Sequence, residues 1–179
     1  GTFLNDTSNS YSFTGLLTSQ EYDVYIQALC DSSDSSLWAG PISFSTLCVE
    51  NAPYFENFDA TFPICWNQNT NDNFDWSVNS GATNSVNTGP SDDITGGGNY
   101  LYIEASVPQS TGDSAILTSP YIDISSLASP ALTFYSHMYG AAVDYLRVDV
   151  SDDGGASYSN VFSKSGDQGD QWNLEVVNL

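Results

Sequence analysis

Basic side chains are nearly absent from this sequence. Its 179 residues include 2 Lys or Arg residues against 22 Asp or Glu residues, and the formal net charge is −20 with the single His neutral. Nucleic-acid binding requires clustered Lys and Arg that neutralise phosphates, and anionic membrane surfaces attract the same clusters. Because Arg147 and Lys164 are isolated, both classes of partner are excluded.

Long apolar runs and strong helix formers are also scarce. No apolar run approaches the roughly 20 residues that span a bilayer, and no charged-then-apolar N-terminal segment resembles a signal peptide. The residues are 40% hydrophobic and 13% charged, which allows a folded core and excludes a disordered acidic tail. Abundant Ser, Thr, Asn, Gly, Tyr and Phe favour strands and polar turns.

Alternating apolar and polar residues predict strands throughout the chain. Residues 22–28 place Tyr22, Val24, Ile26 and Ala28 on one face. Further strands are predicted at residues 11–17, 42–46, 100–104, 131–135 and 146–150. Many short strands separated by polar turns, without a capped amphipathic helix, indicate an all-β sandwich.

The first part of the chain resembles a known family. Residues 16–30, then Ser36 to Pro41 and Phe44-Ser45-Thr46, resemble the C-terminal half of a fibronectin type III domain, as in secreted multidomain proteins of the Bacteroidota. The resemblance implies that a leucine and Tyr22 form the corner entering the penultimate strand. Since such a sandwich takes roughly 100 residues, residues 1–47 are predicted to be a partial domain with an open strand edge and a bare apolar face.

Residues 48–179 resemble a MAM domain that lacks its last strands. The motifs that carry this resemblance occur in the family's order: Phe55-Glu56, Cys65-Trp66, residues 72–76, Gly89-Pro90, Asp93-Ile94-Thr95, residues 98–104, Leu117-Thr118-Ser119-Pro120, residues 134–140 and residues 166–179. The resemblance implies a two-sheet jelly-roll β-sandwich used outside the cell for adhesion or as an accessory module.

Three cysteines in a chain almost without lysine suggest an oxidising, extracellular setting. The MAM resemblance implies a disulfide between Cys48 and Cys65, with Cys30 unpaired within this chain. Three free buried thiols are the alternative. Zinc is disfavoured because no Cys-x-x-Cys pair exists and the single histidine, His137, lies in an aromatic strand, where it is interpreted as a packed structural residue.

Calcium is the favoured cofactor, in a structural role. The resemblance points to Glu56 and Asp93 as ligands, with Asp72 and Asp75 as weaker candidates, and backbone carbonyls could add to the six to eight oxygens that calcium takes. The alternative is that these acids are solvated turn residues.

Residues 149–160 superficially suggest a second calcium loop. An EF-hand is excluded because Asn160 occupies position twelve, where a bidentate Glu is required. An Asp-box hairpin, in which Asp and Gly make the turn of residues 151–158 and an aromatic side chain packs, is the preferred interpretation.

Catalytic motifs are not found. The sequence contains no Gly-x-Ser-x-Gly elbow, His-Glu-x-x-His helix or phosphate-binding glycine loop, and a nucleophile–base pair would need His137. Trp38, Trp66, Trp76 and Trp172 could form a sugar-stacking platform, but the last three coincide with family core motifs, which favours packing and leaves Trp38 as the candidate sugar contact.

The sequence therefore predicts a non-catalytic adhesion or scaffolding module of a larger secreted or cell-surface protein. Its expected partners are other protein domains of the same or a neighbouring chain. The alternative is a carbohydrate-binding accessory module of a secreted polysaccharide-degrading enzyme or peptidase, with extracellular polysaccharide as partner. An anionic domain would repel sulfated or uronic polysaccharides unless calcium intervened.

Overall fold

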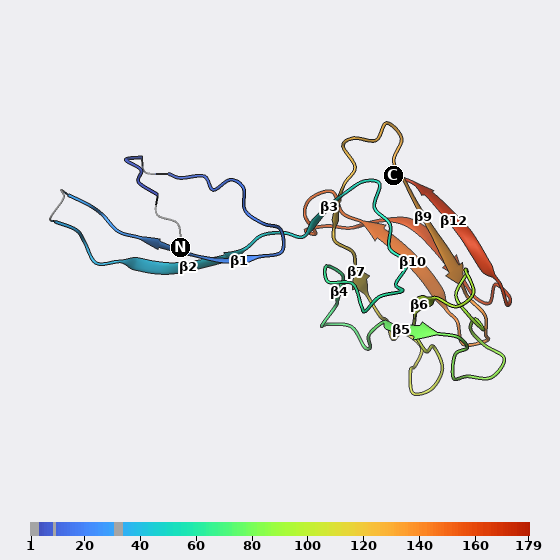
Figure 1. Cartoon of the computed structure of the whole chain (residues 1–179). Coiled ribbons are helices and arrows are strands. Elements are labelled where there is room, and N and C mark those ends of the chain that lie inside the picture. Colours follow the sequence, from blue (N-terminus) through green and yellow to red (C-terminus); the bar gives the residue numbers. More distant parts are fainter. Residues whose placement is uncertain (1–3, 9, 31–33) are drawn as a thin grey trace. The chain divides into compact units, whose positions relative to one another are not determined.

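The computed structural model describes residues 4–8, 10–30 and 34–179, and all its regular elements are strands (Figure 1). No helix forms in these residues, so none is available to cross a membrane. The chain divides into two compact units, residues 1–50 and 51–179. The strands are β1 (Glu21–Ile26), β2 (Ala39–Ser45), β3 (Val49–Asn51), β4 (Asn67–Gln68), β5 (Ser77–Ser80), β6 (Asn99–Tyr102), β7 (Leu117–Thr118), β8 (Tyr121–Asp123), β9 (Ala131–His137), β10 (Tyr145–Val150), β11 (Ser159–Ser165) and β12 (Trp172–Asn178).

The first unit is built on an antiparallel hairpin of β1 and β2. Tyr22 lies opposite Phe44, and the two rings stack with their centroids 5.7 Å apart. Phe13 extends this aromatic cluster, with its ring centroid 6.2 Å from that of Phe44. The predicted strands at residues 22–28 and 42–46 are confirmed by this hairpin. Ile26 is 59% exposed, which agrees with the bare apolar face predicted for residues 1–47, and the register of the hairpin shifts between Val24 and Ile26.

The strand predicted at residues 11–17 is wrong. Residues 11–17 are irregular, although Tyr11 and Phe13 make an edge-to-face pair with ring centroids 5.0 Å apart. The backbone of Leu17 is bonded to side chains in place of a neighbouring strand: its N–H donates to the Tyr22 hydroxyl at 2.9 Å, and its carbonyl accepts from the Thr46 hydroxyl at 2.6 Å. Apolar alternation alone could not reveal this competition from side chains.

In the second unit, β9 pairs antiparallel with β12 and β10 with β11, and Figure 1 shows β9 beside β12. β5 pairs with β6, and β4 with β7. The predictions at residues 100–104, 131–135 and 146–150 are confirmed by β6, β9 and β10.

The core of the second unit lies between β6, β9, β11 and β12. Tyr100 and Val177 are 5% and 6% exposed, and Phe134 meets Phe162 edge-to-face at 5.3 Å between centroids. One ionic contact is included: the buried Glu175 carboxylate accepts hydrogen bonds from Lys164 Nζ and the Ser136 hydroxyl. Successive side chains of a strand point to opposite faces, so the inward side chains of β9 and β12 face this core and the residues between them form the outer face.

Candidate functional site

Two acidic side chains converge on the loop before β6. The Asp93 carboxylate accepts hydrogen bonds from the Thr95 hydroxyl at 2.5 Å, the Thr95 N–H at 3.0 Å and the Gly98 N–H at 2.9 Å. An Asp that bonds the backbone ahead of it makes this kind of turn, and Gly96 and Gly97 supply the positive φ values of 79° and 114° that follow. The Thr95 hydroxyl and the Gly98 amide together hold the pKa of Asp93 at about 2.

Asp59 reaches the same loop from another segment. Its Oδ1 accepts from the Asn99 N–H at 2.8 Å, and its carbonyl accepts from the Asn99 side-chain amide at 3.0 Å. A Cβ built on Gly98 would stand 2.5 Å from Asp59 Oδ1 and 2.8 Å from Asp93 Oδ2. The two carboxylates are therefore separated by little more than a glycine.

Glu56 belongs to the turn that carries Asp59. Its Oε1 accepts from the Phe58 N–H at 2.8 Å, and the Asn57 side chain bridges to Asp59 at 2.6 Å. The segment is anchored by Phe58, whose ring meets Trp66 edge-to-face at 5.4 Å. Of the four predicted calcium ligands, Glu56 and Asp93 thus belong to neighbouring segments joined through Asp59.

Asp72 and Asp75 belong to a different segment, which makes different contacts. The Asp72 carboxylate accepts from the Ile116 N–H at 2.5 Å, and the adjacent Asn73 side chain accepts from the Ser114 N–H at 3.0 Å. Asp72 is half-buried in this loop-to-loop contact, while Asp75 is exposed. Among the residues that the structure describes, no three His, Cys, Asp or Glu side chains gather closely enough to hold a metal ion.

The sequence pattern does not predict Asp59 as a residue of this site. Its role depends on the turn at Asn57–Asp59, where Phe58 adopts a φ of 60°, and on a contact with Asn99 far along the chain. The sequence shows only an acidic residue three positions after Glu56. Such a spacing is common in acidic chains, so it does not by itself identify a ligand.

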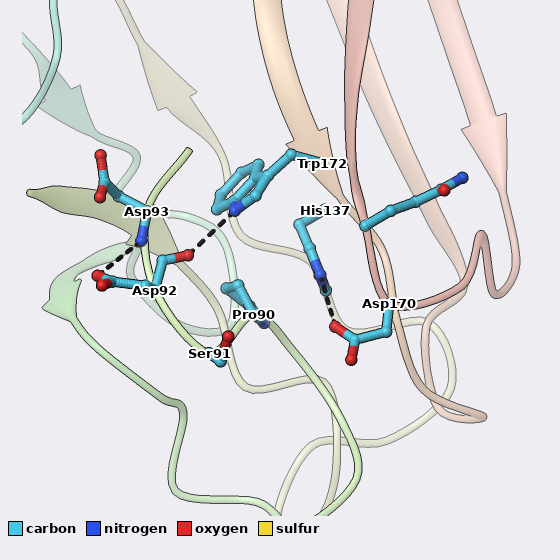
Figure 2. A pocket seen from close by; sticks show the side chains of 8 residues that line it. Pro90, Ser91, Asp92, Asp93, His137, Asp170 and Trp172 are labelled. Carbon is cyan, nitrogen blue, oxygen red and sulfur yellow. Dashed lines mark hydrogen bonds and ion pairs between the residues drawn. The ribbon is translucent and has the colours of Figure 1, made fainter. Parts of the chain in front are cut away.

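A shallow pocket of about 150 Å³ lies at the C-terminal end of β9, where the register places Trp172 opposite His137. Figure 2 shows the ring of His137 between Trp172 and Asp170, facing the segment that carries Pro90. The lining residues are Pro90, Ser91, Asp92, Asp93, His137, Asp170, Gln171 and Trp172.

His137 is a buried polar side chain of this pocket. Its side chain is 3% exposed, and its Nε2 lies 3.2 Å from Oδ1 of Asp170, which is 65% exposed. The ring packs edge-to-face on Trp172, with centroids 5.2 Å apart. Burial lowers the pKa of His137 below its ordinary value, although the Asp170 carboxylate opposes that shift. The packed structural role predicted for His137 is confirmed, and its pairing with Asp170 is an addition.

The tryptophans separate into packed and exposed ones. The indole N–H groups of Trp66, Trp76 and Trp172 donate to the Tyr54 hydroxyl, the Ala115 carbonyl and the Asp92 carbonyl at 3.0, 3.1 and 3.0 Å. The packing interpretation of these three is confirmed. Trp38 is 53% exposed, as a sugar contact would require, but exposure alone does not make a sugar site.

The loop between β10 and β11 is an Asp-box-like hairpin. Asp153 accepts from the hydroxyls of Ser151 and Ser157 at 2.8 and 2.6 Å and from the Ser157 N–H at 2.9 Å. These bonds, led by that of the Ser157 hydroxyl, hold the pKa of Asp153 at about 2. The Asp153 carboxylate bonds within its own turn, in agreement with the hairpin interpretation. The expected packing of the aromatic side chain is wrong, because Tyr158 is 54% exposed.

Cys48 and Cys65 are disulfide-bonded, whereas Cys30 is an exposed free thiol. Since the chain contains three cysteines, this is the pairing that the MAM resemblance implied, and the alternative of three free thiols is wrong.

Comparison with known proteins indicates the family to which this sequence is similar. The sequence profile of the family described as "MAM domain, meprin/A5/mu" matches residues 55–179. The MAM domain-containing glycosylphosphatidylinositol anchor protein 2 of Homo sapiens is 31% identical over 188 residues, which cover 95% of this chain and 19% of that protein. Protein 1 of the same name from Gallus gallus is 40% identical over 112 residues (59% of this chain, 12% of that protein). Neuropilin-1 of Xenopus laevis is 35% identical over 111 residues (61% and 11%). The chain spans about one fifth, 19%, of the human relative's length.

Proposed function

Because this chain belongs to the MAM domain family, which residues 55–179 match, we propose that it is an adhesion module that binds other protein domains. It forms part of a larger secreted or cell-surface protein and has no catalytic activity of its own. The observation that carries the proposal is the family match over most of the chain, with relatives named as glycosylphosphatidylinositol anchor proteins and Neuropilin-1.

The extracellular setting is supported by the disulfide-bonded state of Cys48 and Cys65. Disulfides persist in oxidising compartments and are rare in reducing ones. A net charge of −20 also suits a module that stays soluble and selects its partners electrostatically.

The absence of catalysis is supported by the surroundings of His137. A general base needs a nucleophile within hydrogen-bond reach, but Nδ1 of His137 is buried without a hydrogen-bond partner and Nε2 faces the acceptor Asp170. Within the described residues, the histidine–aspartate pair therefore activates no hydroxyl or thiol.

The fibronectin type III assignment of residues 1–47 is supported by one local feature. The Tyr22 hydroxyl accepts from the backbone N–H of Leu17, five residues upstream, at 2.9 Å. A tyrosine at the start of a strand whose hydroxyl binds the backbone a few residues upstream is the tyrosine corner of Greek-key sandwiches.

A structural calcium ion between Asp59 and Asp93 is part of the proposal, and Glu56 orders the turn that carries Asp59. Both Asp side chains offer carboxylate oxygens, the donor type that calcium prefers, and they face each other across Gly98. The ion would supply positive charge between two segments that otherwise repel each other. Backbone carbonyls of the turns at residues 57–59 and 95–98 would complete its coordination.

The adhesion role and the carbohydrate alternative are separated by one cell-binding experiment. Fluorescent tetramers of the chain are applied to cells of the source organism before and after protease treatment, and before and after periodate oxidation of surface sugars. We expect saturable binding that protease removes and periodate leaves intact. Binding removed by periodate and retained after protease would favour the carbohydrate module, and tetramers made from reduced, alkylated chain serve as the unfolded control.

A further inference from the structure

One edge of β12 is open. The strand pairs with β9 in an unbroken register, from Trp172 opposite His137 to Asn178 opposite Ala131, and no other strand of the described residues pairs with it. Figure 1 shows β12 at the margin of the second unit, beside β9. The edge of β12 that faces away from β9 therefore presents backbone N–H and C=O groups without a partner strand.

The hydrogen bonds of the ladder determine which residues serve this open edge. The Leu179 N–H donates to the Pro130 carbonyl at 3.0 Å, and these two residues continue the register of β12 and β9. Antiparallel strands bond through every second residue, so the odd-numbered residues of β12 bond β9. Leu174 and Val176 therefore direct their N–H and C=O groups to the open edge.

Features that hinder pairing at a strand edge occur on other strands of the chain but not on β12. Prolines and β-bulges are such features. β2 contains Pro41 and shifts register against β1, and the register of β10 and β11 also shifts. β12 has neither a proline nor a register shift. Its one charged residue, Glu175, points into the core, where Lys164 and Ser136 bond it, so an added strand meets no unpaired charge.

The outer face beside the open edge is apolar and uncharged. Leu174 and Val176 are 57% and 62% exposed on this face, and Tyr135, opposite Leu174, is 48% exposed. The outward residues of β9 and β12 include no Asp, Glu, Lys or Arg, although the chain has 22 acidic residues. A strand that extends this sheet is therefore matched when it presents an apolar residue to the outer face at every second position.

The net charge indicates which kind of partner supplies that strand. Two copies of a chain with a net charge of −20 repel each other, whereas the same field attracts a cationic segment. An extended segment with basic residues at its ends and apolar residues between them complements both the field and the outer face.

We propose that the open edge of β12 binds such a segment of a protein partner as an added β-strand, through the backbone groups of Leu174 and Val176. Main-chain hydrogen bonds provide the affinity in this mode of binding, and alternate side chains provide the specificity. The inference rests on the proposed function as a protein-binding module and names the surface that binds and the form of the partner.

The test is an NMR titration of the isotope-labelled full chain with the peptide acetyl-Lys-Thr-Val-Thr-Val-Thr-Lys-amide, followed by amide hydrogen exchange. The matched ligand has the same sequence with its central amide nitrogens methylated, which keeps the side chains and charges and removes the backbone donors. We expect saturable binding that slows exchange of the Leu174 and Val176 amides. The methylated peptide should bind at least about tenfold more weakly because several hydrogen bonds are lost, and equal binding of the two peptides would overturn strand addition.

Two substitutions at one position separate the backbone from the side chain. Val176→Pro removes an N–H of the open edge that β9 does not use, a place where a strand tolerates proline, and should weaken peptide binding about tenfold. Val176→Thr keeps the N–H and the β-branched shape and should bind within about twofold. Equal affinities of these variants, or protection that appears outside β12, would overturn the proposal. If Val176→Pro does not fold, the comparison of the two peptides on the unaltered chain decides.

Two further measurements test the choice of partner. A peptide with Glu in place of both Lys residues should bind more weakly, and equal binding would overturn the assignment of basic ends. Exchange of the Leu174 and Val176 amides that slows with rising chain concentration, without peptide, would identify a second copy as the occupant and overturn the partner assignment. Tetramers that bind cells while the peptide titration fails would overturn this inference and leave the adhesion proposal intact.

Discussion

Asp59 and Asp93 meet across Gly98. A Cβ at Gly98 would lie 2.5 Å from Asp59 Oδ1 and 2.8 Å from Asp93 Oδ2, and the same two carboxylates accept the backbone N–H groups of Asn99 and Gly98 at 2.8 and 2.9 Å. The glycine therefore allows two acidic segments to bind consecutive amides of one loop. This relationship accounts for the first two predictions.

Gly98→Ala should destabilise the second unit. Both carboxylates are fixed by hydrogen bonds, so they cannot yield freely to a methyl group, and we expect a loss of about 1–3 kcal/mol in the free energy of unfolding, as for overpacked sites. Urea unfolding measures it. In the Asp59→Ala background the same substitution should cost less, since one of the two close contacts is gone; equal costs in both backgrounds would show that the clash is unimportant.

Calcium should raise the thermal stability of the chain through Asp59 and Asp93, with Glu56 ordering the turn that carries Asp59. A ligand that binds only the folded state adds about 2.7 kcal/mol at a hundredfold excess over Kd, and magnesium should add less because it demands a tighter octahedron. Melting curves with calcium, magnesium and chelator are compared for the unaltered chain, Glu56→Gln, Asp59→Asn and Asp93→Asn.

Asp75→Asn is the matched control for calcium binding, because Asp75 is exposed on another segment. Asp59→Asn and Asp93→Asn should lose the calcium shift and Glu56→Gln should reduce it, whereas Asp75→Asn should keep it. Equal shifts from both divalent ions, unchanged in every variant, would mean diffuse screening of the negative charge and no specific site.

Much of the fold was predictable, and the reasons differ by element. Residues 131–135 and 146–150 were predicted because local alternation reflects one buried face, and both form strands. Residues 11–17 alternate as well, but side chains of Tyr22 and Thr46 take the Leu17 backbone groups that a ladder would use.

The site was less predictable because it is assembled by long-range register. Asp170 faces His137 only because β12 pairs with β9 so that Trp172 lies opposite His137. Asp59 likewise acquires its partner, Asn99, from another segment. Neither relationship has a local sequence pattern, whereas the cysteine pairing came from the ordered motifs of a family.

The Asp153 turn should make stability depend on acid pH. Its hydrogen bonds hold the pKa at about 2 against an ordinary value of 3.8. A depressed pKa in the folded state contributes stability that is fully present above the unfolded value and is lost as the pH falls through the folded value. Asp153→Asn should therefore be less stable than the unaltered chain at pH 7, with a difference that shrinks between about pH 4 and pH 2.

Urea unfolding across that range measures the Asp153 effect. Asp152→Asn removes the same charge from the adjacent exposed residue and should change stability little at any pH. A difference for Asp153→Asn that stays constant down to pH 2 would contradict a role for the ionised carboxylate.

Tyr22→Phe tests the corner in the first unit. The substitution keeps the ring on Phe44, 5.7 Å between centroids, but removes the hydroxyl that accepts the Leu17 N–H at 2.9 Å. We expect the free energy of local opening at the Leu17 amide, measured by hydrogen exchange, to fall by about 0.5–1.5 kcal/mol. Tyr25→Phe, at a ring that is 52% exposed, is the control, and equal protection of Leu17 in both variants would argue against a tyrosine corner.

The ion pair of Lys164 and Glu175 should respond differently from the exposed pair of Arg147 and Asp149. Glu175 is 7% exposed; burial alone raises its pKa, but hydrogen bonds from Lys164 and Ser136 outweigh that effect and leave the pKa below its ordinary value. Lys164→Met leaves a buried carboxylate without its cation and should cost about 3 kcal/mol, whereas Arg147→Met, at a side chain that is 50% exposed, should cost less than about 1 kcal/mol.

The double variant Lys164→Met/Glu175→Leu should recover most of the loss, because removing both charges also removes their desolvation penalty. Chemical denaturation measures all three, and a double variant no more stable than Lys164→Met would show that the pair's packing, and not its charge, stabilises the sheet.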